Sequence, residues 1–154
     1  MTIKIAVVNE SLNNEARVAL DPEIAQKLAS NNVSFIIEKN AGESSGFLDS
    51  AYPENACKFV SSSEDALKDA DVLFKVNPPT SDEIEKMKRG SMAISYMNPF
   101  QNDALIKQMA SSGVDAFSVE LIPRISRAQS MDALSSQASI ACLLYTSPSP
   151  RDRG

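Results

Sequence analysis

The chain of 154 residues contains no histidine. Without an imidazole there is no histidine general base, no Ser-His-Asp triad and no histidine metal site. Cysteine is nearly absent as well, because Cys57 and Cys142 are its only cysteines. Two cysteines are too few for a zinc cage or a disulfide scaffold. The composition therefore predicts no metal site and no catalytic group of these kinds.

Long apolar runs and a positive net charge are missing too. No apolar stretch approaches the roughly 18–20 residues of a membrane-spanning helix. The opening residues, MTIKIAVVNE, show neither the apolar core nor the cleavage site of a signal peptide. The formal net charge of −5 gives no general attraction to nucleic acid or anionic lipid. We expect a cytoplasmic globular protein without nucleic-acid partners.

Short strand patterns alternate with helical patterns along the chain. The strand patterns cover residues 3–8, 33–38, 58–60, 72–76, 91–97 and 116–121. The helical patterns begin near residues 22, 63, 80 and 102, and a last one begins near 126 or 130. Strands that are separated by helices favour crossover connections and a parallel sheet covered on both sides. The order predicts an α/β fold with an open, mostly parallel, Rossmann-like sheet and helices on both faces.

Residues at the helix ends support this alternation. Asp21 is a natural N-cap because Pro22, which lacks an N–H, occupies the first helical position. Thr80 and Glu83 have the spacing of a capping box. Further expected helix ends are the caps Ser63 and Asn102 and the stops Gly90 and Gly113.

The glycine-rich fingerprint of dinucleotide-binding domains is absent. Gly42 and Gly46 form the chain's one close pair of glycines, spaced G-x-x-x-G in a loop after a strand. The fingerprint is G-x-G-x-x-G at the start of a helix, where the backbone cradles a phosphate. We therefore expect an α/β domain without a phosphate cradle of its own.

The most informative stretch is PRISRAQSMDALSS, at the expected junction between the last strand and the last helix. If a helix begins there, Gln129, Asp132 and either Ser135 or Ser136 are three or four residues apart and share a face. Loops after the carboxyl ends of parallel strands are where such folds bind ligands. A structural alternative is open, since Ser126 and Gln129 also have capping-box spacing and Asp132 would offset the helix dipole.

The last residues do not continue the pattern. From residue 143 the chain reads LLYTSPSPRDRG, in which two prolines prevent a helix and the charged end has nothing to bury. We expect one domain over residues 1–142 and a disordered, non-native tail over residues 143–154, so that the chain is truncated.

Five stretches, taken in order, resemble segments of one known family. They are NNEARVALDP (13–22), AGESSGF (41–47), ADVLFKVNPP (70–79), SYMNPFQNDAL (95–105) and PRISRAQSMDALSS (123–136). Over residues 1–141 the chain is similar to the N-terminal domain that proton-translocating NAD(P) transhydrogenase alpha chains share with alanine dehydrogenases. The last stretch is the specific one, and it resembles the family segment that reaches the bound nicotinamide nucleotide.

The resemblance implies an NAD(H) site that binds and orients without a catalytic residue. Arg124 matches an arginine that donates to the nucleotide's phosphate or carboxamide region, as its planar fork of donors allows. Gln129, Asp132 and Ser135 match the residues that hold the dihydronicotinamide ring and ribose. Ser130 and Met131 would add backbone contacts. The implied reaction is direct hydride transfer between NADH and NADP, which needs no histidine.

The family also implies partners that this chain does not contain. They are a second NAD-binding domain, a membrane-embedded component that couples the reaction to proton translocation, and a component that holds NADP(H). The resemblance implies a homodimer at the cytoplasmic side of the inner membrane, attached through its partner subunit. It further implies that this chain alone is inactive and has an exposed apolar face where the missing parts would dock.

Two alternatives stay open at this point. In alanine dehydrogenases the positions of Arg17 and Lys75 hold the carboxylate of pyruvate, which would make this chain an amino-acid oxidoreductase domain. Those enzymes use a histidine after the fifth strand, however, and Asn98 stands there in this chain. Arg17 could instead pair with Glu15, and Lys75 could extend along the sheet. The other alternative is a fragment with no activity of its own.

Overall fold

The chain divides into two compact units, residues 1–118 and residues 119–154. The structure, a computed structural model, describes residues 2–11, 14–29, 31–123, 125–132, 134–135, 138–139 and 142. The expected tail, residues 143–154, therefore lies outside the described residues, and the expected domain boundary at 142 stays a prediction.

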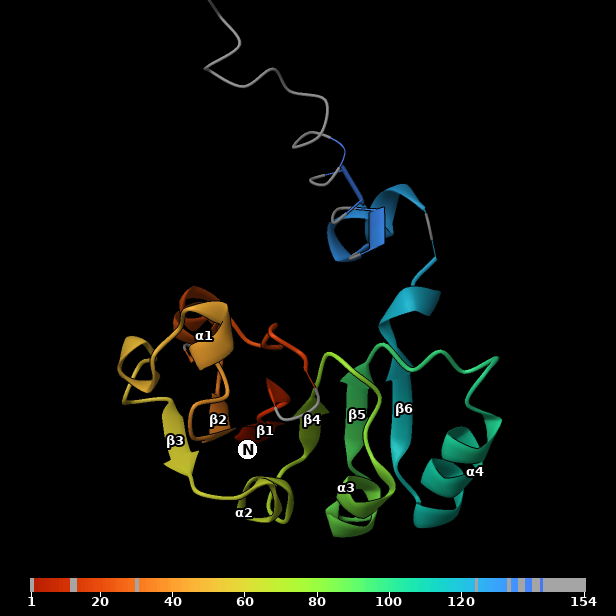
Figure 1. The fold of residues 1–154 in the computed structure, drawn as a ribbon, viewed down its shortest axis with the longest axis horizontal. Coiled ribbons are helices and arrows are strands. Elements are labelled where there is room, and N and C mark those ends of the chain that lie inside the picture. The colour runs from red at the N-terminus through yellow and green to blue at the C-terminus, as the bar shows by residue number, and fades with distance from the viewer. Residues whose placement is uncertain are drawn as a thin grey trace, which may run out of the picture. The chain divides into compact units, whose positions relative to one another are not determined.

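A six-stranded sheet forms the centre of the first unit (Figure 1). Its strands are β1 (Ile3–Val7), β2 (Val33–Glu38), β3 (Cys57–Val60), β4 (Val72–Phe74), β5 (Met92–Ser95) and β6 (Asp115–Ser118). All five neighbouring pairs are parallel, and the spatial order is β3-β2-β1-β4-β5-β6. The order reverses between β1 and β4, which is the switch point where open α/β sheets commonly bind ligands.

Local sequence signals mark several of the helix ends. They are α1 (Pro22–Ala29), α2 (Ser63–Leu67), α3 (Ser81–Lys86) and α4 (Asp103–Ser112). The Asp21 carboxylate accepts from the N–H of Glu23 at 2.7 Å. The Thr80–Glu83 capping box is present with both of its hydrogen bonds. At the other end of α4, Gly113 adopts the left-handed conformation, as expected of a helix stop.

Two buried apolar clusters lie on opposite faces of the sheet. One packs Leu67 of α2, Ile84 of α3 and Met109 of α4 against strand residues such as Leu73 and Ala93. The other packs Ala25 of α1 against Val7, Phe35 and Ile37. In Figure 1, α1 accordingly stands apart from the group of α2, α3 and α4. The expected α/β fold, with a parallel sheet and helices on both faces, is confirmed.

The face beneath α1 is covered unevenly. The cluster on that side takes its buried strand residues from β1, β2 and β3. Met92 and Ile94 of β5 alternate with the buried Ala93 and so point to the α1 side, yet they belong to neither cluster. Phe117, the register partner of Ile94 in β6, is 45% exposed. Within the described part of residues 2–118, the apolar side chains of β5 and β6 on this face are thus only partly covered.

Several element ends differ from the sequence predictions. The α2 cap is Ser62, whose hydroxyl accepts from the N–H of Asp65, and not Ser63. Helix α3 ends at Lys86 before Gly90 because Met87 adopts an extended backbone and buries its side chain. Asn102 precedes α4 without a side-chain cap, since its amide donates to the carbonyl of Met97 at 2.9 Å.

The last predicted strand also ends early. Strand β6 stops at Ser118, and the apolar residues that follow form the 3-10 helix η4 (Val119–Leu121). Strands β4 and β5 are shorter than predicted as well, ending at Phe74 and Ser95. Apolar periodicity locates a strand but does not show where its hydrogen-bond ladder stops.

Candidate functional site

The predicted nucleotide corner lies in the second unit. Its main described element is the 3-10 helix η5 (Ser126–Met131), which contains Ser130 and the backbone of Gln129. Arg124 and the side chain of Gln129 lie outside what the structure describes. The corner therefore begins as a 3-10 helix, in which residues three apart are aligned along one side.

Asp132 and Ser135 are brought together directly after η5. The backbone N–H of Ser135 donates to Asp132 Oδ1 at 3.0 Å, and the carbonyl of Ser135 accepts from the hydroxyl of Ser139 at 2.8 Å. Asp132 therefore satisfies a backbone N–H of the following turn, a structural role besides the dipole effect that the sequence suggested. Ser130 and Ser135 are exposed, and Met131 is 56% exposed. Three of the six predicted site residues are consequently accessible at the surface.

The carboxyl edge of the sheet holds a second group of polar residues, centred on Glu10. This side chain follows β1 and is only 3% exposed. Its Oε1 accepts from the N–H of Val76 at 2.7 Å and its Oε2 from the N–H of Asn77 at 2.9 Å, both just after β4. Glu10 thereby bridges the switch point between β1 and β4. Sequence reasoning missed it, although an acidic residue directly after a buried strand is a usable signal.

Lys75 is held at the same edge by Glu83. The Lys75 side chain is 2% exposed, and its ammonium lies 2.8 Å from Glu83 Oε2. It also donates to the carbonyl of Pro78 at 3.5 Å. The same Glu83 oxygen accepts from the N–H of Thr80, so one carboxylate serves both the capping box and the buried lysine. The capping box was predictable from spacing, whereas its lysine partner, eight residues away, was not.

Arg17 forms an ion pair with Glu15, which is one of the two roles that the sequence left open for it. Its Nε and Nη2 donate to the two oxygens of Glu15, each at 2.8 Å. The Asn77 amide donates to Glu15 Oε2 at 3.3 Å. Hydrogen bonds from Arg17 lower the pKa of Glu15 to about 2, and the same contacts raise the pKa of Arg17. Both cations that could hold a 2-oxoacid therefore already contact carboxylates.

Asn98, where the resemblance places the histidine of alanine dehydrogenases, lies between β5 and α4. Its backbone is left-handed, with φ of 45°, and its carbonyl accepts from the N–H groups of Gln101 and Asn102. Its side-chain amide donates to Gln101 Oε1 at 2.8 Å. An amide does not act as an acid or base as an imidazole does. Through these hydrogen bonds Asn98 shapes the turn before α4.

The Gly42–Gly46 loop forms a tight turn. A Cβ at Gly42 would lie 2.8 Å from both the carbonyl oxygen of Phe47 and the hydroxyl of Tyr52, so this position requires glycine. Gly46 ends the 3-10 helix η2 (Glu43–Ser45) with φ of 84°. The Tyr52 hydroxyl donates to the carbonyl of Leu20 at 2.9 Å and ties the loop to the chain before α1. Close packing accounts for glycine at position 42, and the left-handed backbone accounts for glycine at position 46.

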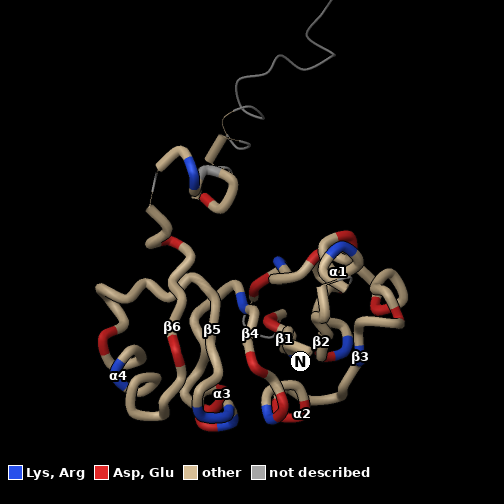
Figure 2. The backbone as a smooth tube through the Cα atoms, turned by 180° about the vertical axis from the view of Figure 1, so that it is seen from behind, with Lys and Arg blue, Asp and Glu red and all other residues tan. Residues whose placement is uncertain are grey.

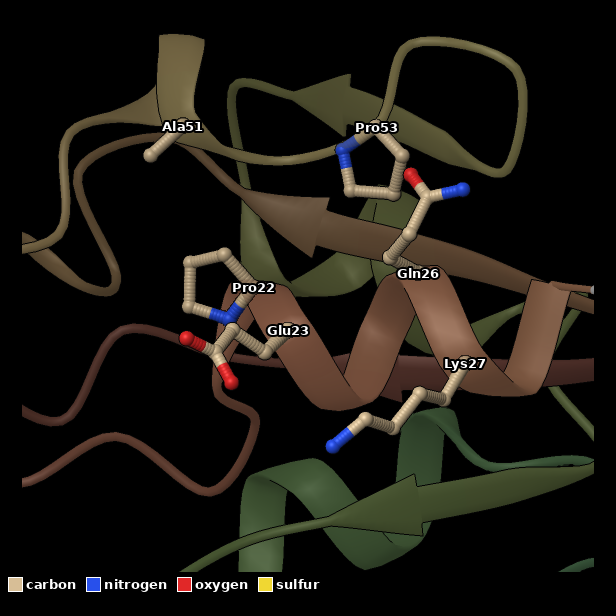
Figure 3. Close-up of a pocket in the computed structure, with 6 residues that line it drawn as sticks. All are labelled: Pro22, Glu23, Gln26, Lys27, Ala51 and Pro53. Atoms are coloured by element: carbon tan, nitrogen blue, oxygen red, sulfur yellow. The ribbon is translucent and has the colours of Figure 1, made fainter.

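A surface hollow of about 450 Å³ lies between α1 and the chain before β3 (Figure 3). Gln26 extends toward Pro53 across it, and Glu23 and Lys27 bring charges of opposite sign to its rim. The lining residues are Pro22, Glu23, Gln26, Lys27, Ala51 and Pro53. None of the predicted nucleotide-binding residues contributes to it.

Charged and metal-ligating residues indicate no further site on the described surface. Helix α2 carries the acidic Glu64 and Asp65, whereas α3 carries acidic residues in its first turn and the basic Lys86 in its last (Figure 2). Across the described ranges, no three His, Cys, Asp or Glu side chains are grouped so as to hold a metal ion. Burial raises the pKa of the Cys57 thiol to about 11, which makes it a poor nucleophile. The described helices include none that is long and apolar enough to cross a membrane.

Comparison with known proteins places these features in one family. The model for the alanine dehydrogenase/PNT N-terminal domain matches residues 6–141. NAD(P) transhydrogenase subunit alpha of Haemophilus influenzae is 39% identical over 137 residues, which cover 89% of this chain and 26% of that protein. Alanine dehydrogenase 1 of Staphylococcus aureus is 31% identical, with 87% of this chain and 36% of that protein covered.

A solved structure supports the same placement. The crystal structure of transhydrogenase from Sinorhizobium meliloti superposes with a TM-score of 0.83 and 40% identity. The match covers 90% of this chain and 41% of that one. This chain thus spans well under half the length of the relatives it matches.

Proposed function

The chain belongs to the alanine dehydrogenase/PNT N-terminal domain family, and from this premise we propose that it is the first part of the NAD(H)-binding component of a transhydrogenase. The complete assembly would pass hydride between NADH and NADP and couple that transfer to proton translocation. The 154-residue chain would supply a wall of the nucleotide site and have no activity alone.

The observation that carries this proposal is the graded similarity within the family. Over nearly the whole chain, identity is 39% to a transhydrogenase alpha subunit and 31% to an alanine dehydrogenase. The likeness to the transhydrogenase crystal structure, at 40% identity, points the same way.

The residues at the carboxyl edge support the same choice over an amino-acid dehydrogenase. The chain has no histidine, and Asn98 is bonded into a turn at the position where those enzymes need an acid or base. Arg17 and Lys75 each already contact a carboxylate, Glu15 and Glu83. A 2-oxoacid would therefore meet two compensated cations and no histidine.

The polar groups of the corner fit a nicotinamide nucleotide. A carboxamide needs an acceptor for its NH₂ and a donor for its oxygen, and a carboxylate and an amide side by side can provide both. We assign these roles to Asp132 and Gln129, with Ser135 toward the ribose and Arg124 toward the phosphate or carboxamide region. Exposed Ser130 and Met131 would add backbone contacts.

In this proposal the chain's residues orient the ring and do no bond chemistry. Bound NADH supplies the hydride, and NADP held by a partner component accepts it. Asp132 and Gln129 hold the carboxamide so that the ring cannot rotate out of line. Placing two rings at reaction distance and excluding water contributes most of the rate enhancement in a reaction without acid or base catalysis.

The partners follow from the same proposal. They are a second NAD-binding domain, a membrane-embedded component and an NADP-binding component, arranged around a homodimer at the cytoplasmic side of the inner membrane. The partly covered side chains of Met92, Ile94 and Phe117 support a further layer of protein over β5 and β6. Apolar surface of this kind is costly to leave in water and is typical of an interface.

A chimera tests the proposal directly. Residues 1–141 of this chain would replace the matching part of the Haemophilus influenzae alpha subunit, expressed with its partner subunit in membranes. We expect NADH-dependent reduction of an NADP analogue, because the grafted corner meets its missing second domain. The rate should fall on Gln129→Ala or Asp132→Ala much more than NADH affinity does, as measured by stopped-flow turnover and equilibrium binding.

The matched control is Asp103→Ala, which removes an exposed carboxylate of α4 far from the corner in sequence. It should leave turnover unchanged. A chimera that folds and binds NADH but reduces no analogue would contradict the assignment, as would equal turnover in the corner variants and the control.

A further inference from the structure

The switch point of the sheet contains two convergent backbone donors and one buried acceptor. The N–H groups of Val76 and Asn77 both point at the carboxylate of Glu10, at 2.7 and 2.9 Å. Glu10 is 66 positions from Val76 and 67 from Asn77 in sequence, so tertiary folding has to bring it to them. Glu10 is buried to all but 3%.

Glu10 differs from the other carboxylates at this edge in how it is bonded. Glu38 accepts from a single backbone donor, the N–H of Asn9, at 2.9 Å and remains half-buried. Glu83 uses one oxygen for its contacts with Lys75 and Thr80. Each oxygen of Glu10 accepts a hydrogen bond from one of two neighbouring backbone N–H groups. Proteins bind a carboxylate or phosphate ligand through backbone N–H groups in the same way.

This geometry occurs where open α/β sheets bind anionic ligands. Two adjacent N–H groups, one in a buried contact and one in a part-buried contact, stabilise an oxyanion because they need no rearrangement to do so. Arg17 adds positive charge nearby, since its pKa is raised in part by Glu10. The place that a ligand oxyanion would take is therefore filled by the chain's own side chain.

We propose that Val76 and Asn77 form an oxyanion receptor at the switch point and that Glu10 is its internal ligand. The receptor accepts a small carboxylate or phosphate oxyanion only when the Glu10 carboxylate is removed. In the unsubstituted chain the Glu10 carboxylate keeps other anions from these two donors and joins the chain after β1 to the chain after β4. The inference rests on these contacts and not on the transhydrogenase assignment.

Chemical rescue of Glu10→Ala is the test. The substitution deletes one methylene and the carboxylate, leaving a space the size of acetate between the two donors. We expect the melting temperature of the 154-residue chain to fall by roughly 5–10 °C. Sodium acetate should restore about half of this loss, with a rise that follows the acetate concentration as mass action requires. Sodium chloride at equal ionic strength should not.

Three controls make the result specific. The unsubstituted chain and Glu38→Ala should show only the general salt response. Glu10→Gln keeps the volume but faces one N–H with an amide NH₂, so it should melt lower and not be rescued, because no space is left for acetate. In amide-resolved NMR, acetate should shift the Val76 and Asn77 N–H signals of Glu10→Ala.

The possible outcomes separate cleanly. If Glu10→Ala is unfolded in chloride, folding driven by acetate in far-ultraviolet circular dichroism supports the proposal. A variant that stays unfolded at every acetate concentration overturns it. So does an acetate response shared by Glu10→Gln or the unsubstituted chain, or a Glu10→Gln variant that melts like the unsubstituted chain.

Discussion

The carboxyl edge of the sheet and the corner around residues 125–135 use the same kinds of polar residue in opposite ways. At the edge, Glu10, Lys75 and Glu83 are buried or nearly so. Glu10 accepts from the backbone just after β4, and Lys75 forms an ion pair with Glu83 of α3. In the corner, Ser130 and Ser135 are exposed and the described contacts are local. The difference shows that residue type alone does not identify a ligand site. A polar group already satisfied inside the fold holds the fold together, whereas an accessible one remains available to a ligand.

Among the changes that test this contrast, breaking the buried ion pair is expected to lower the free energy of unfolding most. Glu83→Ala leaves the Lys75 ammonium, 2% exposed, without its carboxylate. Removing one member of a buried pair typically costs about 3–5 kcal/mol because an uncompensated charge stays buried. We expect a decrease of that size in the free energy of unfolding, measured by urea titration.

Asp103→Ala is the matched control for this prediction. It breaks an ion pair with Lys107 whose side chains are 73% and 75% exposed. Exposed pairs contribute about 0–1 kcal/mol, so the control should remain close to the unsubstituted chain. Equal losses in the two variants would mean that burial does not distinguish the edge from the surface.

The sequence predicted the order of elements because local signals agreed with one another. Apolar runs located all six strands, and the Thr80–Glu83 box and Gly113 located helix ends correctly. The end of β4 that was missed depends on tertiary contacts. The N–H groups of Val76 and Asn77 donate to Glu10, from a segment more than sixty residues away, and not to β5. No local pattern carries that information.

The site was only partly predictable for the same reason. The Glu15–Arg17 pair is two residues apart and could be weighed from sequence alone. The Lys75–Glu83 contact and the Glu10 bridge depend on which strand exits meet at the switch point. For the corner, Arg124 and the Gln129 side chain lie outside the described residues, so the roles assigned to them stay predictions.

A smaller, pH-dependent effect is expected at the outer part of the edge. Arg17 holds the pKa of Glu15 at about 2, below its ordinary value of 4.5. Because the folded pKa is the lower one, the pair stabilises the fold above pH 4.5, and this contribution disappears as the pH falls through about 2. The Arg17 side chain is 65% exposed, which limits the contribution to about 1 kcal/mol.

Arg17→Gln isolates this contribution. The free energies of unfolding of the variant and the unsubstituted chain should differ at neutral pH and converge as the pH approaches 2. Taking the difference cancels the other titrating carboxylates, which are common to both proteins. A difference that stays constant over this range would show that Glu15 does not depend on Arg17 for its low pKa.

The smallest effect on stability is expected in the corner, together with a large effect on turnover. Asp132 accepts the backbone N–H of Ser135, and losing this hydrogen bond in Asp132→Ala should cost about 0.5–1 kcal/mol of unfolding free energy. In the chimera the same change should slow hydride transfer by about tenfold or more, because one misplaced contact loosens the ring. Asp132→Asn keeps an oxygen for Ser135 and separates the two roles. Normal stability with slow turnover in this variant would place the carboxylate's function on the nucleotide. A large loss of stability with normal turnover would make the corner a second structural region like the edge.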